Sequence, residues 1–347
     1  MSPLLLTFML MNLGLGTTIT FASSHWLLAW MGLEINTLAI LPLMIQHNHP
    51  RAVEATIKYF LIQITAAAMA LFAGMTNASL TGQWDILQLS HPLPLLMMTT
   101  ALVMKIGLAP LHMWFPEVLQ GMDLTTGLIL STWQKLAPFI LLIQIKPENT
   151  TLLVTVALIS IAIGGWAGLN QTQLRKILAY SSIAHIGWIV LVTHFSLTTT
   201  LLALLIYLVI STSSFLLFKL NKATNINMLA ISWAKAPMLT TLAPLLLLSL
   251  GGLPPLTGFM PKWLIIQELT KQDLAPAATV AALTALLSLY FYLRLSYAMT
   301  LTTSPNNISG LTPWRHTTNQ HTLPLAILTT TALLLLPLTP TLIALLS

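Results

Sequence analysis

The feature that most constrains this chain is a succession of apolar runs, each about twenty residues long and separated from the next by a short polar break. A helix of roughly twenty apolar residues crosses the ~30 Å hydrocarbon core of a bilayer. The ninth run is longer than the others and is predicted to be interrupted. The runs predict about eleven transmembrane helices, near residues 3–22, 25–45, 57–76, 93–114, 125–145, 150–169, 174–194, 198–219, 238–267, 275–297 and 324–345.

The composition agrees with a membrane environment. Of the 347 residues, 56% are hydrophobic and only 6% are charged, whereas soluble domains carry about 25% charged residues. We therefore predict an all-α integral membrane protein with one polytopic membrane domain over residues 1–347. The net charge of +6 comes from scattered Lys and Arg residues, so the clustered basic face that nucleic acid requires is not expected.

The positions of the basic residues predict the orientation of the chain. The side that holds the N-terminus is predicted to carry nine Lys and Arg residues and the opposite side two, and positive charge stays on the side of synthesis. The N-terminus is therefore expected on the cytoplasm-like side, or in the matrix if the protein is mitochondrial. The nine are Arg51, Lys58, Arg175, Lys176, Lys219, Lys222, Lys235, Arg294 and Arg315, and the two are Lys146 and Lys271.

Four charged residues lie inside the apolar runs: Glu34, Lys105, Lys135 and Lys262. The first three are each about 15–18 Å from the start of their helix and so near the bilayer midplane. A charge there costs at least ~3 kcal/mol if nothing compensates it. The compensation can be an ion pair, loss or gain of a proton, or hydration in an internal cavity. One acid can pair with only one lysine, so the other lysines are candidate proton carriers. The alternative is that the lysines only pack helices or snorkel to a headgroup, which reaches only several ångströms.

A short repeat marks two of the predicted helices. Residues 107–117 and 252–262 both read Gly-Leu-x-Pro-Leu, then four residues, then Pro and a charged residue. The paired prolines break helical hydrogen bonding, so the fourth and ninth helices are predicted to be broken. Because five helix positions separate the copies, we predict two inverted five-helix repeats, about 1–146 and 150–297, plus one extra helix at about 324–345. Inverted repeats with broken helices are typical of transporters, although kinks in a polytopic protein can also coincide by chance.

Two histidines are candidate relays. His112 follows the first predicted break, and His185 lies in the seventh helix beside Ser181 and Ser182. Imidazole exchanges protons close to neutral pH. Each histidine could equally be a hydrogen-bonded residue inside the bundle. The chain has no cysteine and no recognisable phosphate loop or paired-carboxylate site, so no cofactor or metal site is expected in it.

Several motifs together resemble subunit 2 of mitochondrial NADH:ubiquinone oxidoreductase (respiratory complex I), in the antiporter-like subunit family, over nearly the whole chain. These motifs are Trp30-Met-Gly-Leu-Glu34, Lys105-Ile-Gly-Leu-Ala-Pro-Leu-His112 with Trp114 and Pro116-Glu117, Trp133-Gln-Lys135, Leu169-Asn-Gln-Thr172, Arg175-Lys176, Ala179-Tyr-Ser-Ser-Ile-Ala-His185, and Gly251-Gly-Leu-Pro-Pro-Leu-Thr-Gly258 with Lys262.

The resemblance implies a proton-translocating subunit of the inner mitochondrial membrane. It implies that Glu34 and Lys105 form a coupling ion pair, that Lys135 is the central proton carrier and that Lys262 lies on the exit side. NADH, FMN, iron–sulfur clusters and ubiquinone would be bound by other subunits. The implied partners are membrane-arm subunits 4, 4L, 3 and 6, accessory subunits and lipids such as cardiolipin. Two alternatives remain: a subunit of a multi-component sodium/proton antiporter, and a scaffold whose charges only lock helix packing.

Overall fold

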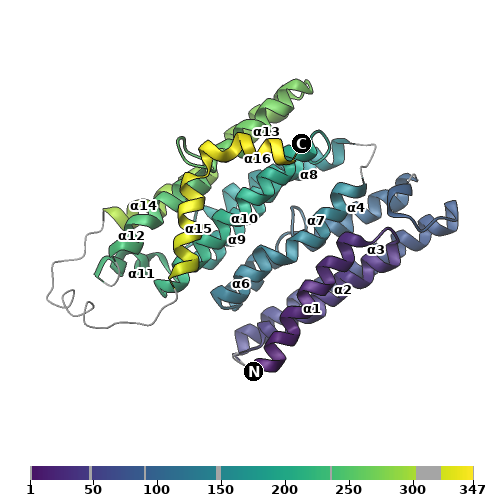
Figure 1. Ribbon diagram of the computed structural model, residues 1–347, viewed down its shortest axis with the longest axis horizontal. Coiled ribbons are helices and arrows are strands. Elements are labelled where there is room, and N and C mark those ends of the chain that lie inside the picture. Colours follow the sequence, from purple (N-terminus) through teal and green to yellow (C-terminus); the bar gives the residue numbers. More distant parts are fainter. Residues whose placement is uncertain are drawn as a thin grey trace. The chain divides into compact units, whose positions relative to one another are not determined.

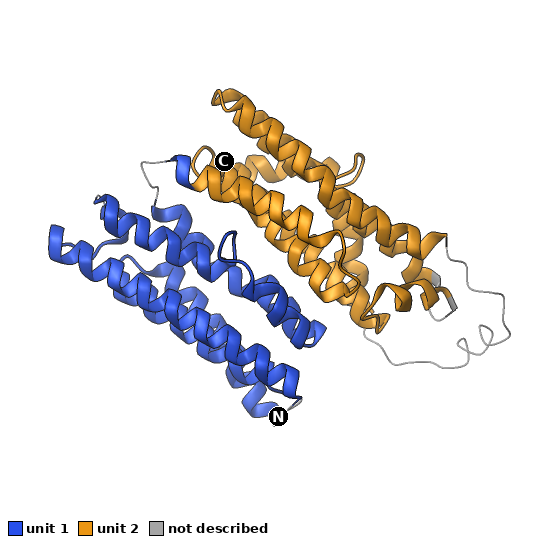
Figure 2. Cartoon of the chain, turned by 180° about the vertical axis from the view of Figure 1, so that it is seen from behind, with its two compact units in different colours: residues 1–152 blue, residues 153–347 orange. Residues whose placement is uncertain are grey.

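The computed structural model describes residues 2–46, 49–89, 91–145, 150–234, 237–301 and 322–346. These residues form helices joined by short connections, with two isolated β-bridges. They divide into two compact units, residues 1–152 and 153–347 (Figure 2). The boundary falls beside the one predicted between the repeats. The long polar connection over residues 298–323 lies largely outside the described residues.

Unit 1 begins with three long helices that pack side by side (Figure 1): α1 (Pro3–Ala22), α2 (Trp26–Met44) and α3 (Pro50–Thr81). The single turn η1 (Ile86–Gln88) leads into a broken helix made of α4 (Pro92–Ile106) and α5 (Trp114–Gly121). The next span is also interrupted, as α6 (Leu124–Ser131) and α7 (Trp133–Ile145).

Unit 2 contains α8 (Thr150–Gly168), α9 (Leu174–Val192) and α10 (Leu197–Leu220), then the short α11 (Ile226–Ala230) and η2 (Ile231–Ala234). The second broken helix follows as α12 (Pro237–Gly251) and α13 (Phe259–Lys271), and α14 (Ala275–Thr300) completes the set. The C-terminal segment is α15 (Leu323–Leu334), η5 (Leu336–Leu338) and α16 (Thr339–Leu346). The Thr257 hydroxyl, in the second break, donates to the Ala332 carbonyl of α15.

The spans agree with a multi-pass membrane protein. Among the described residues, eight segments are long and apolar enough to cross a bilayer when α6 and α7 are counted as one, and the bent C-terminal pair makes nine. The apolar segments α4 and α12 are too short to span alone, because each is one half of a predicted broken helix. Two details differ from the sequence expectation. The fifth span is interrupted at Thr132, and the C-terminal helix bends by 66° around η5, which contains Pro337. Proline cannot donate the hydrogen bond that would continue the helix there.

The two units repeat a backbone feature at matching places. In unit 1, the segment at the start of α2 pairs with the connection that follows α3. Trp26 N donates to Trp84 O (3.0 Å), and Ile86 N donates to Ser24 O (2.9 Å). In unit 2, the segment at the start of α9 pairs in the same pattern with the connection that follows α10. Leu174 N donates to Thr224 O (3.0 Å), and Ile226 N donates to Thr172 O (3.2 Å). The equivalence supports the predicted repeat, whose inverted relationship stays a prediction.

Glycines on α8 allow its neighbours to approach closely. A Cβ on Gly164 would lie 2.8 Å from the Ala184 backbone nitrogen of α9, and one on Gly165 would meet the Leu287 side chain of α14 at 2.9 Å. Both distances are shorter than van der Waals contact. The neighbouring helices therefore occupy the space that a side chain on either glycine would need. Small residues serve the same purpose in other membrane helix pairs.

Gly164→Ala is therefore expected to lower the stability of the assembled protein by about 1–3 kcal/mol, as overpacking does. The measurement is the thermal unfolding midpoint of the purified assembly. Gly14→Ala is the matched control, because nothing lies within 4 Å of a Cβ at that position. Equal midpoints for the two variants would contradict the close α8–α9 contact.

Candidate functional site

Lys105 and Lys135 are buried and Lys262 is half-buried, and the three share one structural property: each lies at an interruption of a membrane helix. Lys105 is the next-to-last residue of α4, Lys135 is the third residue of α7, and Lys262 is the fourth residue of α13. Helix interruptions leave backbone groups without helical partners. A helix C-terminus also attracts positive charge, which applies to Lys105 at the end of α4 and to Lys262 at the end of α12. The sequence predicted the breaks beside Lys105 and Lys262 and missed the one beside Lys135.

The two broken helices end in the same way. Gly107 and Gly252 both have left-handed backbone conformations, with φ of 82° and 76°, which glycine adopts without steric cost. The residue after each glycine donates a hydrogen bond to the carbonyl five residues before it: Leu108 N to Val103 O (3.1 Å) and Leu253 N to Leu248 O (3.3 Å). The following X–Pro peptide bonds, at Pro110 and Pro255, are both cis. The sequence repeat thus corresponds to one local structure that occurs twice.

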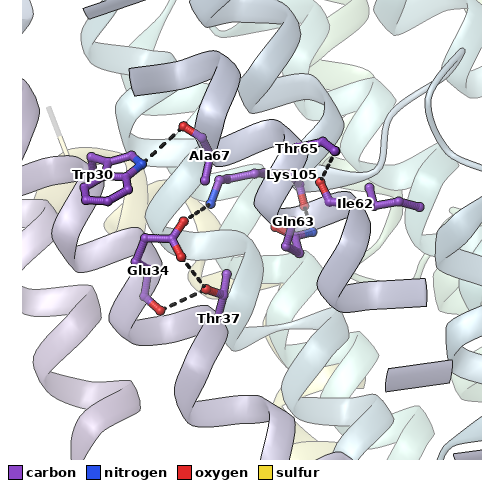
Figure 3. A network of polar contacts seen from close by, with 8 residues as sticks. All are labelled: Trp30, Glu34, Thr37, Ile62, Gln63, Thr65, Ala67 and Lys105. Atoms are coloured by element: carbon purple, nitrogen blue, oxygen red, sulfur yellow. Dashed lines mark hydrogen bonds and ion pairs between the residues drawn. The ribbon is translucent and has the colours of Figure 1, made fainter. Parts of the chain in front are cut away.

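Glu34 and Lys105 face each other across α2 and α4 (Figure 3). The Glu34 Oε1–Lys105 Nζ distance is 4.0 Å, and the side chains are 20% and 1% exposed. This separation allows an ion pair but is too long for a hydrogen bond. Thr37 Oγ1 donates to the second carboxylate oxygen at 3.4 Å. Among the described residues, neither Glu34 Oε1 nor Lys105 Nζ has a hydrogen-bond partner.

Lys105 and Lys135 line the same cavity in unit 1. Its volume is about 20 Å³, measured over the positions open to the centre of a water molecule, and a water needs about 10–15 Å³ on this measure. The Lys135 ammonium also lies 4.3 Å from the centre of the Phe115 ring, which belongs to α5. A cation over an aromatic face is stabilised by the ring electrons. The fold therefore places two lysines from different helices around one space that can hold water.

Amide side chains complete this cavity, and the sequence analysis did not identify them. Asn36, Gln63 and Gln134 all line it, together with Tyr59. Gln63 Nε2 donates to the Lys105 carbonyl (3.4 Å) and Gln134 Nε2 to the Asn36 carbonyl (3.2 Å). An amide inside a run that must cross lipid is expensive unless it serves a polar interior. The sequence analysis applied this rule to charged residues only. Applied to amide side chains as well, it would have identified Asn36, Gln63 and Gln134.

Lys262 and His185 line a second cavity, in unit 2, also of about 20 Å³. Lys262 Nζ donates to the carbonyl of Gly251, the last residue of α12, at 2.8 Å. The lysine thus caps the first half of its own broken helix. His185 Nε2 lies 3.5 Å from the Tyr292 hydroxyl, and its ring centroid lies 5.8 Å from that of Tyr207.

The other predicted relay, His112, is not among the residues that line either cavity. It is 2% exposed, and its Nδ1 lies 3.3 Å from the Pro110 carbonyl within the first break. These contacts support a structural role for this histidine. Among the described residues, no group of three or more His, Cys, Asp or Glu side chains is placed to hold a metal ion.

Known proteins identify the class to which this fold belongs. A family model described as "NADH:quinone oxidoreductase/Mrp antiporter, TM" matches residues 23–288, and one described as "NADH dehydrogenase subunit 2 C-terminus" matches residues 289–343. The fold is similar to a chain of respiratory complex I from Thermus thermophilus, with a TM-score of 0.80 and 26% identity over 97% of this chain and 80% of that one. It is also similar to a chain of an Mrp complex from a Dietzia species, with a TM-score of 0.80 and 18% identity over 97% and 76%.

This polytopic helical chain is thus an antiporter-like membrane subunit. The NADH-ubiquinone oxidoreductase chain 2 of Tetraodon nigroviridis is 68% identical over 98% of both chains, and that of Gadus morhua is 65% identical over the full length of both. The chain belongs to the NADH-ubiquinone oxidoreductase chain 2 family.

Proposed function

We propose that this chain translocates protons as a membrane subunit of NADH:ubiquinone oxidoreductase, through a path that includes Glu34, Lys105, Lys135 and Lys262. The observation that carries the proposal is the cavity of unit 1, which Lys105 and Lys135 both line, with the Glu34 carboxylate 4.0 Å from Lys105 Nζ. Buried lysines are costly in a membrane protein, and where they occur they mark ion and proton pathways.

The Glu34–Lys105 pair is the step at which the rest of the complex can act on this chain. At 4.0 Å the two groups are near the limit of an ion pair, so a small movement of α2 or α4 pairs or separates them. The proton affinity of a lysine depends strongly on an adjacent carboxylate. Separation and pairing therefore alter the proton occupancy of Lys105, and Lys135 exchanges protons with it through the shared cavity.

Unit 2 provides the exit end of the path. Lys262 there receives the proton, and His185, which lines the same cavity, is the candidate relay toward it. An imidazole can accept a proton on one ring nitrogen and release one from the other. In this proposal a proton passes from Lys135 to Lys262 by way of water and His185.

The chain itself performs no electron transfer in this proposal. It contains no cysteine and so supplies no thiolate ligand to an iron–sulfur cluster. In this proposal, other subunits bind the clusters and also NADH, FMN and ubiquinone. Membrane-arm subunits 4, 4L, 3 and 6, accessory subunits and lipids such as cardiolipin surround it in the inner mitochondrial membrane. The bias of Lys and Arg positions supports a matrix-side N-terminus.

Lys262→Met in the assembled complex is expected to lower proton translocation driven by NADH severalfold, because methionine fills similar space but carries no proton. Purified complex in proteoliposomes, with a pH-sensitive dye, gives the measurement. Lys271→Met is the matched control, since Lys271 is an exposed lysine at the end of the same helix, paired with Glu268 at 2.8 Å.

Normal translocation in the Lys262→Met complex would remove this residue from the path. The same assay without sodium tests the transported ion. Translocation that requires sodium would contradict a proton path and favour a sodium/proton antiporter.

A further inference from the structure

The amide of Asn36 is the most unusual buried group near the proposed path. The residue is 2% exposed, and among the described residues neither its side-chain nitrogen nor its side-chain oxygen has a hydrogen-bond partner. Buried amides are nearly always hydrogen-bonded, and an exception calls for a bound water or a functional reason. Leaving such a group unsatisfied destabilises the folded protein.

The position of Asn36 indicates what would satisfy it. Asn36 lines the cavity shared by Lys105 and Lys135, whose volume suffices for at least one water molecule. Its backbone carbonyl accepts a hydrogen bond from Gln134 of α7 at 3.2 Å, which ties α2 to the helix that carries Lys135. The residue therefore links the helix of Glu34 to the helix of Lys135.

The α1–α2 packing holds the amide in place. Gly16 of α1 lies against it, and a Cβ on Gly16 would be 2.4 Å from Asn36 Oδ1. Glycine at this point leaves the space that the amide occupies. The close approach limits the amide to few orientations, so its donor and acceptor are directed by the fold.

We infer that Asn36 is a positioning residue that binds the water joining Lys105 to Lys135. An amide suits this role because it has both donors and an acceptor and carries no charge that would compete with the two ammonium groups for a proton. It orients water without itself exchanging a proton. The role of Asn36 rests on the proposed proton path, because a bridging water matters only if protons move between these lysines.

Asn36→Leu tests the inference, since leucine has similar size and no hydrogen-bonding group. In purified, fully assembled complex, proton-coupled NADH oxidation is expected to fall about five- to tenfold, the effect of losing roughly one hydrogen bond in the rate-limiting transfer. The solvent deuterium isotope effect on that rate is expected to increase, because proton transfer becomes more limiting. Asn36→Ser, which keeps a donor and an acceptor, is expected to stay within about twofold of the unmodified complex.

Asn77→Leu is the matched control. Asn77 is a buried amide of the same unit, its side-chain oxygen has no partner among the described residues, and its nitrogen donates to the Gln83 carbonyl at 3.3 Å, away from the cavity. It can lower thermal stability but is expected to leave the isotope effect unchanged. An unchanged isotope effect in Asn36→Leu, or an equal loss of rate in Asn36→Ser, would overturn the inference.

The failure of this inference can be told apart from failure of the proposed function. If Lys135→Met impairs translocation while Asn36→Leu does not, the path stands and Asn36 has no role in it. If Lys135→Met is also normal, the path itself is wrong.

Discussion

Replacement of Lys135 with methionine is expected to reduce proton translocation coupled to NADH oxidation by at least about tenfold, as loss of a group that exchanges protons does, while the complex still assembles. Lys135 is 6% exposed, lies at the start of α7 and lines the cavity that also contains Lys105. Methionine occupies similar space and suits a buried position. The change therefore removes the titratable group with little effect on packing.

The decisive comparison is Lys135→Arg. Arginine keeps the positive charge and can stack on the Phe115 ring that Lys135 contacts, but it does not lose its proton in proteins. If Lys135 carries protons, the arginine variant is expected to be as impaired as the methionine variant. If the charge only holds helices together, the arginine variant is expected to pump normally, and that result would contradict the proposal. Lys222→Met, an exposed lysine after α10, controls for changes in net charge.

The second large effect is expected at the Glu34–Lys105 pair. Glu34→Gln leaves the Lys105 ammonium, which is 1% exposed, without its counter-charge. Breaking a buried ion pair in this way costs about 3–5 kcal/mol, whereas removing both partners is close to neutral. We expect Glu34→Gln to lower both the amount of assembled complex and its proton translocation.

The double variant Glu34→Gln/Lys105→Met separates stability from function. It contains no unpaired buried charge, so assembly and thermal stability are expected to recover toward those of the unmodified complex. Translocation is expected to stay low, because the pair whose separation changes proton occupancy is gone. Full recovery of translocation, measured per assembled complex, would show that the two charges serve only helix packing.

Residues at the breaks show what sequence reasoning could and could not reach. The Gly-Leu-x-Pro-Leu repeat predicted interruptions beside Lys105 and Lys262, because glycine and proline act on their own backbone. The sequence analysis did not predict the interruption beside Lys135, at Thr132, although α7 contains Pro138, which removes the helical hydrogen bond to the Gln134 carbonyl.

In the candidate site, too, the sequence indicated individual residues but not which of them lie together. Glu34, Lys105, Lys135 and Lys262 stood out in the sequence because a charge inside an apolar run is costly wherever the run folds. The sequence did not indicate which of these residues lie close together. That Lys105 and Lys135 share a cavity while His112 lies outside it depends on contacts between helices that are far apart along the chain.

The amino-acid sequence by itself determined that the chain must lie in a membrane, where two of its helix breaks occur and which charges it must bury, because hydrophobic length, proline, glycine and ionisable groups act through local free energies. Only the tertiary structure decided which of those groups face one another and that amides such as Asn36 join them around a space for water. The partners of a buried group are set by the three-dimensional packing of distant segments, and no property of a single helix specifies that packing.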